Sequence, residues 1–211
     1  MTGRGLSRAR ILTAALELVD SEGLDALSMR RLGERLGVQA MSLYRHVKDK
    51  EDLLDGVKAA ILGEMGAPPE TGSVAARCVA WARSLRAVLL SHPNTIPLFT
   101  SRPVKDPVAL QAVEGALRML TDVGLDDRQA LVLYQTLLAF VLGACVLEST
   151  PRAPVAVPAE VLDHPALPTL RKVAEAGRRI SPEMEFEAGL ETLAAGIHAV
   201  YSGEVDEMRP A

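Results

Sequence analysis

The chain has 211 residues, enough to bury a sizeable core in one domain or two. Apolar residues make up 48% and charged residues 24%, as in soluble globular proteins, and an aromatic content of only 3% favours helices over β-sandwiches. The two cysteines lack the spacing of a zinc site, and no stretch reads as a signal peptide or a charge-free membrane span, so we expect a soluble, cytoplasmic protein with no membrane partner, metal or cofactor.

The net charge of −4 conceals an uneven distribution. Residues 1–50 carry nine Lys and Arg against six Asp and Glu, whereas the rest of the chain carries 14 against 21. A cationic N-terminal part on an anionic body is the asymmetry expected when only that part meets nucleic-acid phosphates. DNA is therefore a candidate partner in spite of the negative total.

Prolines divide the chain into two parts. None of the 13 prolines precedes Pro68, and Pro68-Pro69 followed by Gly72-Ser73 forms a break. We therefore expect one domain over residues 1–66 and a second over residues 67–211.

Four helical segments are predicted before the break. The first follows Ser7 as its N-cap and ends at Gly23, and the second is capped by Ser28 and ends at Gly37 after barely two turns. A third, of about two turns, starts near Gln39, and a fourth opens with acidic residues that complement its dipole. Helical spacing places the following residues toward the core: Ile11, Ala15, Leu18, Val19, Met29, Leu32, Leu36, Leu43, Val47, Leu53, Leu54, Val57 and Ile61.

After the break, long helical patterns alternate with short connections. We predict helices near 73–91, 95–101, 107–123, 127–148, 167–179 and 183–202, and a proline-rich loop over Ser149 to Pro168. Strand patterns are hard to find anywhere in the chain, so the predicted fold class is all-α.

The second and third segments, joined at Gly37, form a candidate helix-turn-helix over residues 28–47. A purely structural helical hairpin would have the same spacing. The outward side chains of the third segment favour DNA, because Gln and Arg can bond base edges, hydroxyls reach phosphates, and Met can contact a thymine methyl. We expect DNA contacts from Arg30, Gln39, Ala40, Met41, Ser42, Tyr44, Arg45, His46, Lys48 and Lys50.

Two ordered runs, Gly23 to Val38 and Ser42 to Leu54, resemble the N-terminal domain of the tetracycline-repressor-like (TetR/AcrR) transcriptional regulators. The resemblance extends over about Ser7 to Ile61. In the second half, Phe186 to Ile197 resembles the C-terminal domain of the branch nearest the tetracycline repressors themselves. The resemblance implies a three-helix helix-turn-helix domain followed by a helical ligand-binding and dimerisation domain.

The resemblance also implies roles for the DNA-contacting residues. Small or apolar residues at the helix tip, Ala40 and Met41, depart from the family pattern, so direct base reading there is limited to thymine methyls. Backbone-clamping roles fall to Tyr44, His46 and Lys50, and groove-facing roles to Arg30, Gln39, Ala40, Met41 and Ser42.

Members of this family form homodimers through the helices that correspond to about 127–148 and 183–202. Small residues there let backbones approach closely, and larger apolar residues supply buried area across a twofold axis. An ordinary intrachain core would use the same residue types, so that alternative stays open. The expected interface residues are Leu138, Val141, Leu142, Gly143, Ala144, Gly189, Leu190, Leu193, Ala195, Gly196, Ile197 and Ala199.

The resemblance further implies a small-molecule pocket in the second domain, for an effector whose identity the sequence does not give. Trp81 could instead fill the core, and His92 and Asn94 could cap helices. A metal-chelated ligand would need a cluster of His, Asp or Glu side chains, and we see only His92 without clear partners. We therefore expect no tetracycline–magnesium site. The candidate lining residues are Cys78, Trp81, Leu85, His92, Asn94, Phe99, Leu117, Tyr134, Gln135 and Leu138.

Taken with the resemblance, the residues predict a ligand-responsive repressor that an effector releases from a pseudo-palindromic double-stranded DNA operator. The alternatives are an activator of the same family, or a helical ligand-binding or protein-interaction module without operator binding. We expect no enzyme, because the four histidines are scattered and the GxSxG, HExxH, P-loop and GxGxxG motifs are absent.

Overall fold

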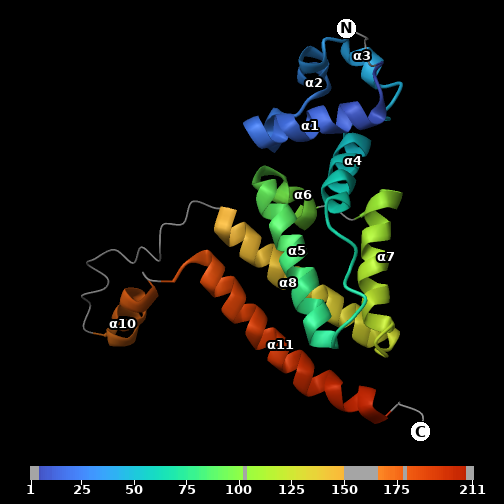
Figure 1. The fold of residues 1–211 in the computed structure, drawn as a ribbon. Coiled ribbons are helices and arrows are strands. Elements are labelled where there is room, and N and C mark those ends of the chain that lie inside the picture. The colour runs from blue at the N-terminus through green and yellow to red at the C-terminus, as the bar shows by residue number, and fades with distance from the viewer. Residues whose placement is uncertain (1–4, 102–103, 150–165, 178–179, 208–211) are drawn as a thin grey trace.

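The computed structural model describes residues 5–101, 104–149, 166–177 and 180–207. Within these ranges the chain forms helices and connecting turns without any strand, which confirms the all-α fold class. Figure 1 shows a small N-terminal head standing on a larger body of long helices.

The head contains four α-helices and one short 3₁₀ turn that the sequence did not predict. Their bounds are α1 Arg8–Glu22, η1 Leu24–Ala26, α2 Met29–Leu36, α3 Ala40–Leu43 and α4 Lys50–Gly63. The side chains of Ser7, Ser28 and Asp49 accept hydrogen bonds from backbone N–H groups three residues on, so each caps the helix that follows it. The predicted starts of α1, α2 and α4 are thereby confirmed.

The core of the head is built from the predicted inward face of each helix. Of the predicted core residues, only Met29 and Leu36 are less than fully buried, and both still pack against the cluster. Leu27, which follows η1, and Leu98 of the body also belong to this core. The head is therefore not sealed off from the body, since one body side chain is part of its interior.

The third helix is shorter than predicted. We expected about two turns from Gln39, whereas α3 is a single turn that passes into a hydrogen-bonded turn after Leu43. The Asp52 carboxylate accepts a 2.7 Å hydrogen bond from the Lys48 backbone N–H, which draws the chain toward α4 directly after Val47. Leu43 and Val47 are both buried, as predicted, so the short helix presents the expected outer face.

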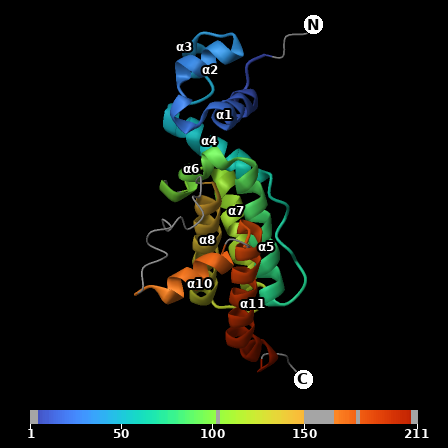
Figure 2. The same ribbon diagram turned by 90° about the vertical axis from the view of Figure 1, so that its left-hand side faces the viewer.

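The body consists of long helices around a central α5. The bounds are α5 Val74–Ser91, η2 Pro93–Thr95, α6 Ile96–Ser101, α7 Pro107–Thr121, α8 Asp127–Ser149, α10 Pro168–Gly177 and α11 Pro182–Glu207. Helix α5 packs between α8 and α11, and α7 packs against α8 and against α4 of the head. Figure 2 shows α4 leading from the head down to the top of the body. Most of the predicted loop Ser149 to Pro168, and the end of the predicted helix 167–179, lie outside the described residues.

Helix α8 has two apolar faces. One face, formed by Ala130, Leu133, Leu137, Val141 and Cys145, is buried in the body. The opposite face carries exposed apolar side chains, namely Leu131, Val132, Val146 and Leu147. By length and composition α8 could cross a membrane. A helix of a soluble protein that is covered on one face by its own chain and on the other by a partner has the same composition.

Candidate nucleic-acid interface and ligand cavity

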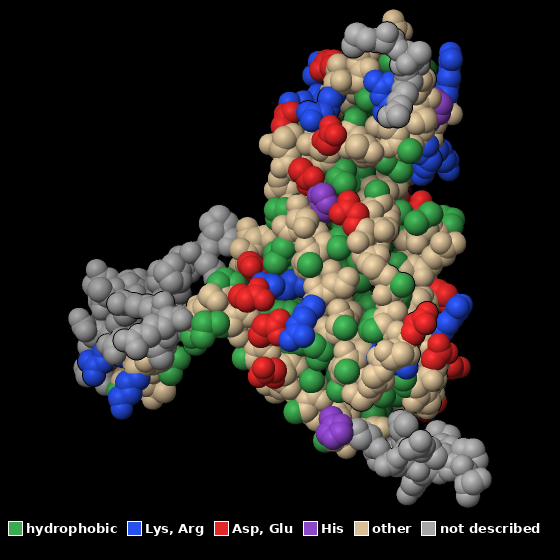
Figure 3. Space-filling model, viewed as in Figure 1, with side chains coloured by type: hydrophobic (Ala, Val, Ile, Leu, Met, Phe, Trp, Pro, Cys, Tyr) green, Lys and Arg blue, Asp and Glu red, His purple; other side chains and the backbone are tan. Residues whose placement is uncertain are grey.

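The outer face of α3 lies at the end of the head farthest from the body (Figure 1). Met41 is 73% exposed, and Tyr44 and Arg45 beside it are also exposed. All ten residues predicted to contact DNA reach the surface: Arg30, Gln39, Met41, Tyr44, Arg45, Lys48 and Lys50 are exposed, and Ala40, Ser42 and His46 are half-buried. Lys and Arg side chains flank the head on both sides in Figure 3.

Close contact between α2 and α3 fixes the angle of this face. Gly33 lies so near the start of α3 that a Cβ atom on it would be 2.8 Å from the Val38 carbonyl oxygen and 3.1 Å from the Ala40 nitrogen. Gly37 ends α2 with a φ of +68°, a left-handed conformation that glycine adopts without strain. The helix-turn-helix thus needs glycine at two positions: Gly33 lets α2 and α3 approach closely, and Gly37 forms the turn between them.

An ion pair between Arg8 and Asp52 fixes the segment that follows α3 and leads into α4. The Arg8 guanidinium donates two hydrogen bonds to the Asp52 carboxylate, at 2.9 and 2.7 Å, and one to the His46 carbonyl oxygen at 3.2 Å. The hydrogen bond from Arg8 lowers the pKa of Asp52, although partial burial opposes the shift. Because Asp52 also holds the Lys48 N–H, this pair fixes the backbone on both sides of Val47.

Arg8 also faces the body. Its Nη2 atom lies 3.9 Å from the carboxylate of Asp106, the N-cap residue of α7. One guanidinium therefore connects the end of the α3 segment, the start of α4 and the start of a body helix. The sequence does not indicate this role for Arg8, because an arginine in the first turn of an amphipathic helix usually faces solvent.

A narrow apolar cavity lies in the body directly below α4. The enclosed part is small, because the centre of a water-sized sphere can occupy only about 60 Å³ of it. The whole empty volume, including the opening to solvent, is about 470 Å³. Trp81 and Tyr134 meet on its wall with ring centroids 5.7 Å apart, and burial raises the pKa of Tyr134. The described lining residues are Lys58, Leu62, Met65, Trp81, Leu85, Phe99, Val104, Ala112, Val113, Tyr134 and Leu138.

Five of the ten predicted pocket residues line this cavity, namely Trp81, Leu85, Phe99, Tyr134 and Leu138. The other five do not: Cys78 is fully buried in the body core, Leu117 is half-buried, Gln135 is exposed, and His92 and Asn94 face the head. Sequence could not separate the two groups, because helical spacing indicates which residues share a face of a helix but not which face borders a cavity.

His92 and Asn94 instead join the body to α1. The Asn94 amide donates hydrogen bonds to the carbonyl oxygens of Val19 and Asp20, at 3.1 and 3.0 Å, which satisfies the C-terminal end of α1. The His92 ring lies between the carboxylates of Asp20 and Glu64. The alternative that these residues cap helices therefore holds for Asn94, which caps the C-terminal end of α1, a helix more than 70 residues away in sequence.

Sequence reasoning missed Lys58, which lies on the wall of the cavity. A signal for it existed, since Lys58 interrupts a helical stripe formed by Leu54, Ile61, Leu62 and Met65. A single charge on an apolar helical face is a candidate buried group, and Lys58 is only 4% exposed.

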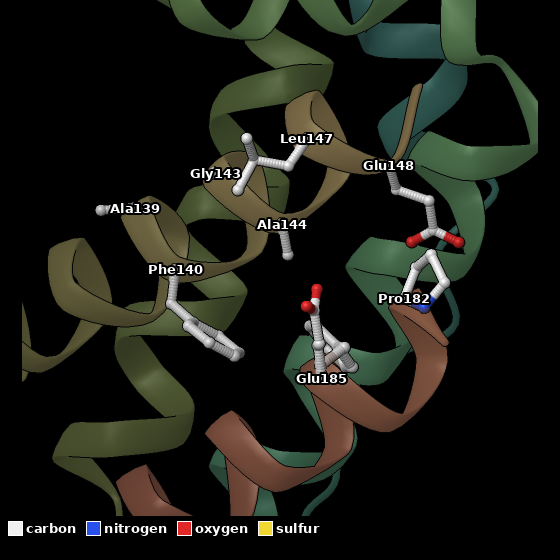
Figure 4. A pocket seen from close by; sticks show the side chains of 9 residues that line it. Ala139, Phe140, Gly143, Ala144, Leu147, Glu148, Pro182 and Glu185 are labelled. Atoms are coloured by element: carbon white, nitrogen blue, oxygen red, sulfur yellow. The ribbon is translucent and has the colours of Figure 1, made fainter. Parts of the chain in front are cut away.

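A second hollow lies on the surface between α8 and α11. It measures about 350 Å³ and is lined by Ala139, Phe140, Gly143, Ala144, Leu147, Glu148, Pro182, Glu185 and Phe186. Figure 4 shows Phe140 and Ala144 on one helix opposite Glu185 and Pro182 on the other. A Cβ atom on Gly143 would meet nothing within 4 Å, so this part of α8 is open to an incoming group.

The predicted dimer-interface residues divide into three sets according to their burial. Val141, Leu190 and Ile197 belong to the core of the chain itself, so for these three the intrachain alternative holds. Gly143, Ala195, Gly196 and Ala199 are exposed. The remaining residues are half-buried: Leu138, Leu142, Ala144, Gly189 and Leu193.

Arg86 holds α5, α8 and α11 together beneath this hollow. Its guanidinium donates to Glu148 at 2.9 Å and to Glu183 at 2.6 Å, and lies 4.6 Å from the centre of the Phe186 ring. Since Arg86 is nearly buried, these partners offset the loss of its hydration. Charge pairs thus join the helices that enclose the hollow, and its lining is apolar apart from Glu148 and Glu185.

The described residues contain no group of three or more His, Cys, Asp or Glu side chains that could hold a metal ion. The two thiols are buried, which raises the pKa of Cys78 to about 12 and that of Cys145 to about 11. Thiols with such pKa values are poor nucleophiles at neutral pH.

Comparison with protein families gives two matches. Residues 11–57 match the family described as bacterial regulatory proteins, tetR family. Residues 67–201 match the family described as tetracyclin repressor-like, C-terminal domain.

Curated proteins and solved structures agree with these matches. The class E tetracycline repressor protein of Escherichia coli is 33% identical over 97% of this chain and 94% of its own length. An HTH-type transcriptional regulator of Saccharopolyspora erythraea is 37% identical over 68% of this chain, a match that spans 61% of that relative. The structure of apo ActR from Streptomyces coelicolor superposes with a TM-score of 0.83, at 32% identity over 94% of this chain and 97% of the other.

Proposed function

The chain belongs to the tetR family of bacterial regulatory proteins, and on this premise we propose that it is a repressor whose head binds an operator in duplex DNA. Regulators of this family bind operators as dimers and respond to small-molecule effectors. The proposal for this chain rests above all on α3 and the residues that flank it. Gln39, Tyr44 and Arg45 are exposed on either side of this helix, and buried Leu43 anchors it to the core. We place the protein in the cytoplasm, where its DNA is.

The operator contacts are of two kinds. Gln39 and Arg45 can reach base edges, while Tyr44, His46 and Lys50 bind phosphates on either side. Exposed Met41 supplies an apolar contact suited to a thymine methyl group. Sequence preference at the centre of each half-site then depends on methyl contacts and DNA shape rather than on bidentate hydrogen bonds.

A homodimer accounts for the apolar outer face of α8 and the hollow beside α11. Exposed apolar patches on soluble proteins mark partner surfaces, and the small residues Gly143 and Ala144 let a second helix approach closely. Two heads related by a twofold axis can then reach successive major grooves, roughly 34–36 Å apart, on a pseudo-palindromic operator.

The cavity below α4 is the proposed effector site. It borders α4, the helix that carries the head, so an occupant that widens it changes the separation of the two heads. If the effector favours a wider arrangement by about 3 kcal/mol, operator affinity falls by a factor of about 100. The ActR structures with actinorhodin and with (S)-DNPA show that relatives of this fold have been crystallised with small organic molecules.

The DNA face can be tested by reversing two charges. The double variant Arg45→Glu, Lys50→Glu should lose binding to the duplex upstream of the protein's own gene in a mobility-shift assay. The matched control Lys105→Glu, Arg118→Glu makes the same change of net charge on exposed residues of the body and should bind as the unmodified protein does. Persistent binding by the first variant would show that another surface contacts DNA.

A further inference from the structure

The C-terminal ends of three helices meet at the His92 side chain. His92 is the C-cap residue of α5, and its ring nitrogens face Asp20 in the last turn of α1 and Glu64, the C-cap residue of α4. Helix C-termini favour a nearby cation, and the last turns of α1, α4 and α5 contain no basic residue of their own. We call the contacts of His92 and Asn94 with α1 and α4 the joint between head and body.

The charges around this ring are all negative. In the part of the chain that the structure describes, Asp20 and Glu64 are the charged groups that face it. The elements that follow it, η2 and α6, contain no charged residue, and the other two acidic residues of α1 pair with arginines of α2. Burial lowers the pKa of His92, but the hydrogen bonds and charges of Asp20 and Glu64 outweigh burial and raise it. The charge of the joint therefore changes with the protonation of one ring.

A second contact of the joint does not titrate. The Asn94 amide holds the carbonyl oxygens of Val19 and Asp20 whatever the pH. The His92 carbonyl oxygen accepts hydrogen bonds from the backbone N–H and the hydroxyl of Thr95, at 2.9 and 2.7 Å, so the backbone that carries the ring is also fixed. A neutral ring keeps only one N–H. Loss of the proton therefore removes one bond between the ring and the head without releasing the head.

We propose that protonation of His92 fixes the head against the body, so that operator affinity falls as the pH rises through neutrality. This inference rests on the proposed function, because it concerns how the head is presented to the operator. Both heads of a dimer must meet the duplex at one separation. A joint that has lost a bond samples more orientations, and the apparent affinity falls with the fraction of molecules whose heads still match the operator.

The coupling is reciprocal, which gives it a second signature. If protonated His92 favours operator binding, then a bound operator favours protonated His92 to the same degree. Formation of the complex therefore takes up protons from solution when the pH is near the pKa of the ring. The proton uptake should be smaller in His92→Gln, whose side chain does not titrate.

The first test measures affinity for the duplex upstream of the protein's own gene by fluorescence anisotropy. Between about pH 6 and pH 9, the affinity of the unmodified protein should fall about fivefold to tenfold more than that of His92→Gln. His46 on the proposed DNA face is present in both proteins, so its own titration cancels in this comparison. The matched control Asn94→Ala loosens the same joint without changing a titratable group, and it should lower affinity by the same factor at every pH.

Two further measurements do not depend on His92→Gln folding normally. Asp20→Asn removes one carboxylate from the ring, so the fall in operator affinity should move to lower pH. Calorimetry of operator binding in phosphate and in Tris buffer, whose enthalpies of ionisation differ, measures the proton uptake of the unmodified protein directly. Circular dichroism at each pH shows that the proteins compared are folded.

The inference is overturned by equal pH profiles for the unmodified protein and folded His92→Gln, or by affinity that depends on His92 but rises toward high pH. An Asp20→Asn profile that coincides with that of the unmodified protein overturns it as well. Each of these results, obtained with intact operator binding, refutes this inference alone. Absence of operator binding at every pH would instead refute the proposed function.

Discussion

The His92 imidazole of the body lies 2.8 Å from the Asp20 carboxylate of the head, and its other ring nitrogen lies 3.2 Å from the carboxylate of Glu64, the residue that follows α4. A neutral imidazole has one N–H and can donate to only one of these carboxylates, whereas an imidazolium can donate to both. Burial lowers the pKa of His92, but the hydrogen bonds and charges of Asp20 and Glu64 outweigh it, and the pKa lies above 6.5. The two carboxylates at the joint between head and body therefore favour the protonated form of the ring.

We predict that this joint weakens as the pH rises. Because the folded-state pKa of His92 exceeds 6.5, the folded protein binds the proton more tightly than the unfolded chain does, and protonation stabilises the fold. The contribution is complete below about pH 6.5 and is lost as the pH passes through the raised pKa. Urea unfolding of the unmodified protein and of His92→Gln should differ by about 1 kcal/mol at low pH and converge at high pH. A difference that stays constant between about pH 5 and pH 9 would contradict the assignment.

Arg8 should matter for DNA binding although it lies behind the DNA face. Arg8→Met removes the anchor of the His46 carbonyl and of Asp52, so the backbone after α3 loosens. We expect about 1 kcal/mol less stability, because the pair is partly exposed, and about fivefold weaker operator binding. Glu17→Gln breaks the exposed ion pair with Arg35 in the same head and should change neither quantity. Equal losses of stability and operator affinity in both variants would mean that breaking any ion pair of the head weakens DNA binding, and that the Arg8 contacts have no special role.

Two glycines should respond oppositely to the same substitution. Gly33→Ala places a methyl group 2.8 Å from the Val38 carbonyl oxygen, and backbone atoms cannot yield as a flexible side chain can. We expect a loss of about 1–3 kcal/mol in the free energy of unfolding and weaker operator binding. Gly63→Ala, at the end of α4, meets nothing within 4 Å and should be neutral or stabilising by up to about 1 kcal/mol. Thermal unfolding measures the stability of both variants. An unchanged stability of Gly33→Ala would contradict the close approach of α2 and α3.

Lys50 should contribute a phosphate contact that salt screens. In Lys50→Gln, the slope of the logarithm of operator affinity against the logarithm of salt concentration should become shallower by about 0.9 for each head. Lys105→Gln in the body should leave the slope unchanged. Fluorescence anisotropy over a range of salt concentrations measures both slopes, and identical slopes for Lys50→Gln and the unmodified protein would remove Lys50 from the DNA face.

The hollow between α8 and α11 should be sensitive to added charge. Gly143→Glu adds a carboxylate where the chain itself has free space, close to Glu148 and Glu185 of the same hollow. We expect the helical content to be unchanged and the dimer to dissociate at least about a hundredfold more readily, because like charges brought together at an interface cost several kcal/mol. Leu110→Glu on α7, an exposed apolar residue, serves as the control. Sedimentation equilibrium in which Gly143→Glu remains fully dimeric would place the interface elsewhere.

Local patterns determined most of the helices and the outward face of α3 that we propose contacts DNA. Capping residues such as Ser28 and glycine stops such as Gly37 act within one helical turn, so their effect is visible in the sequence. The exposed face of α3 follows from the inward placement of Leu43 and Val47, which helical periodicity also gives. The family resemblance then supplied the function that such a face serves.

Contacts between distant segments decided the rest. The sequence could not place His92 beside Asp20, Arg8 beside Asp52 or Lys58 beside the Leu98 carbonyl, because each pair joins residues about 40 or more positions apart whose meeting depends on how whole helices pack. Periodicity assigns a side chain to a face of its own helix, whereas a cavity exists only where several faces fail to fill the space between them. The sequence alone therefore determined the helices and the outward face of α3, and the tertiary structure decided which side chains line the cavity and which join the head to the body.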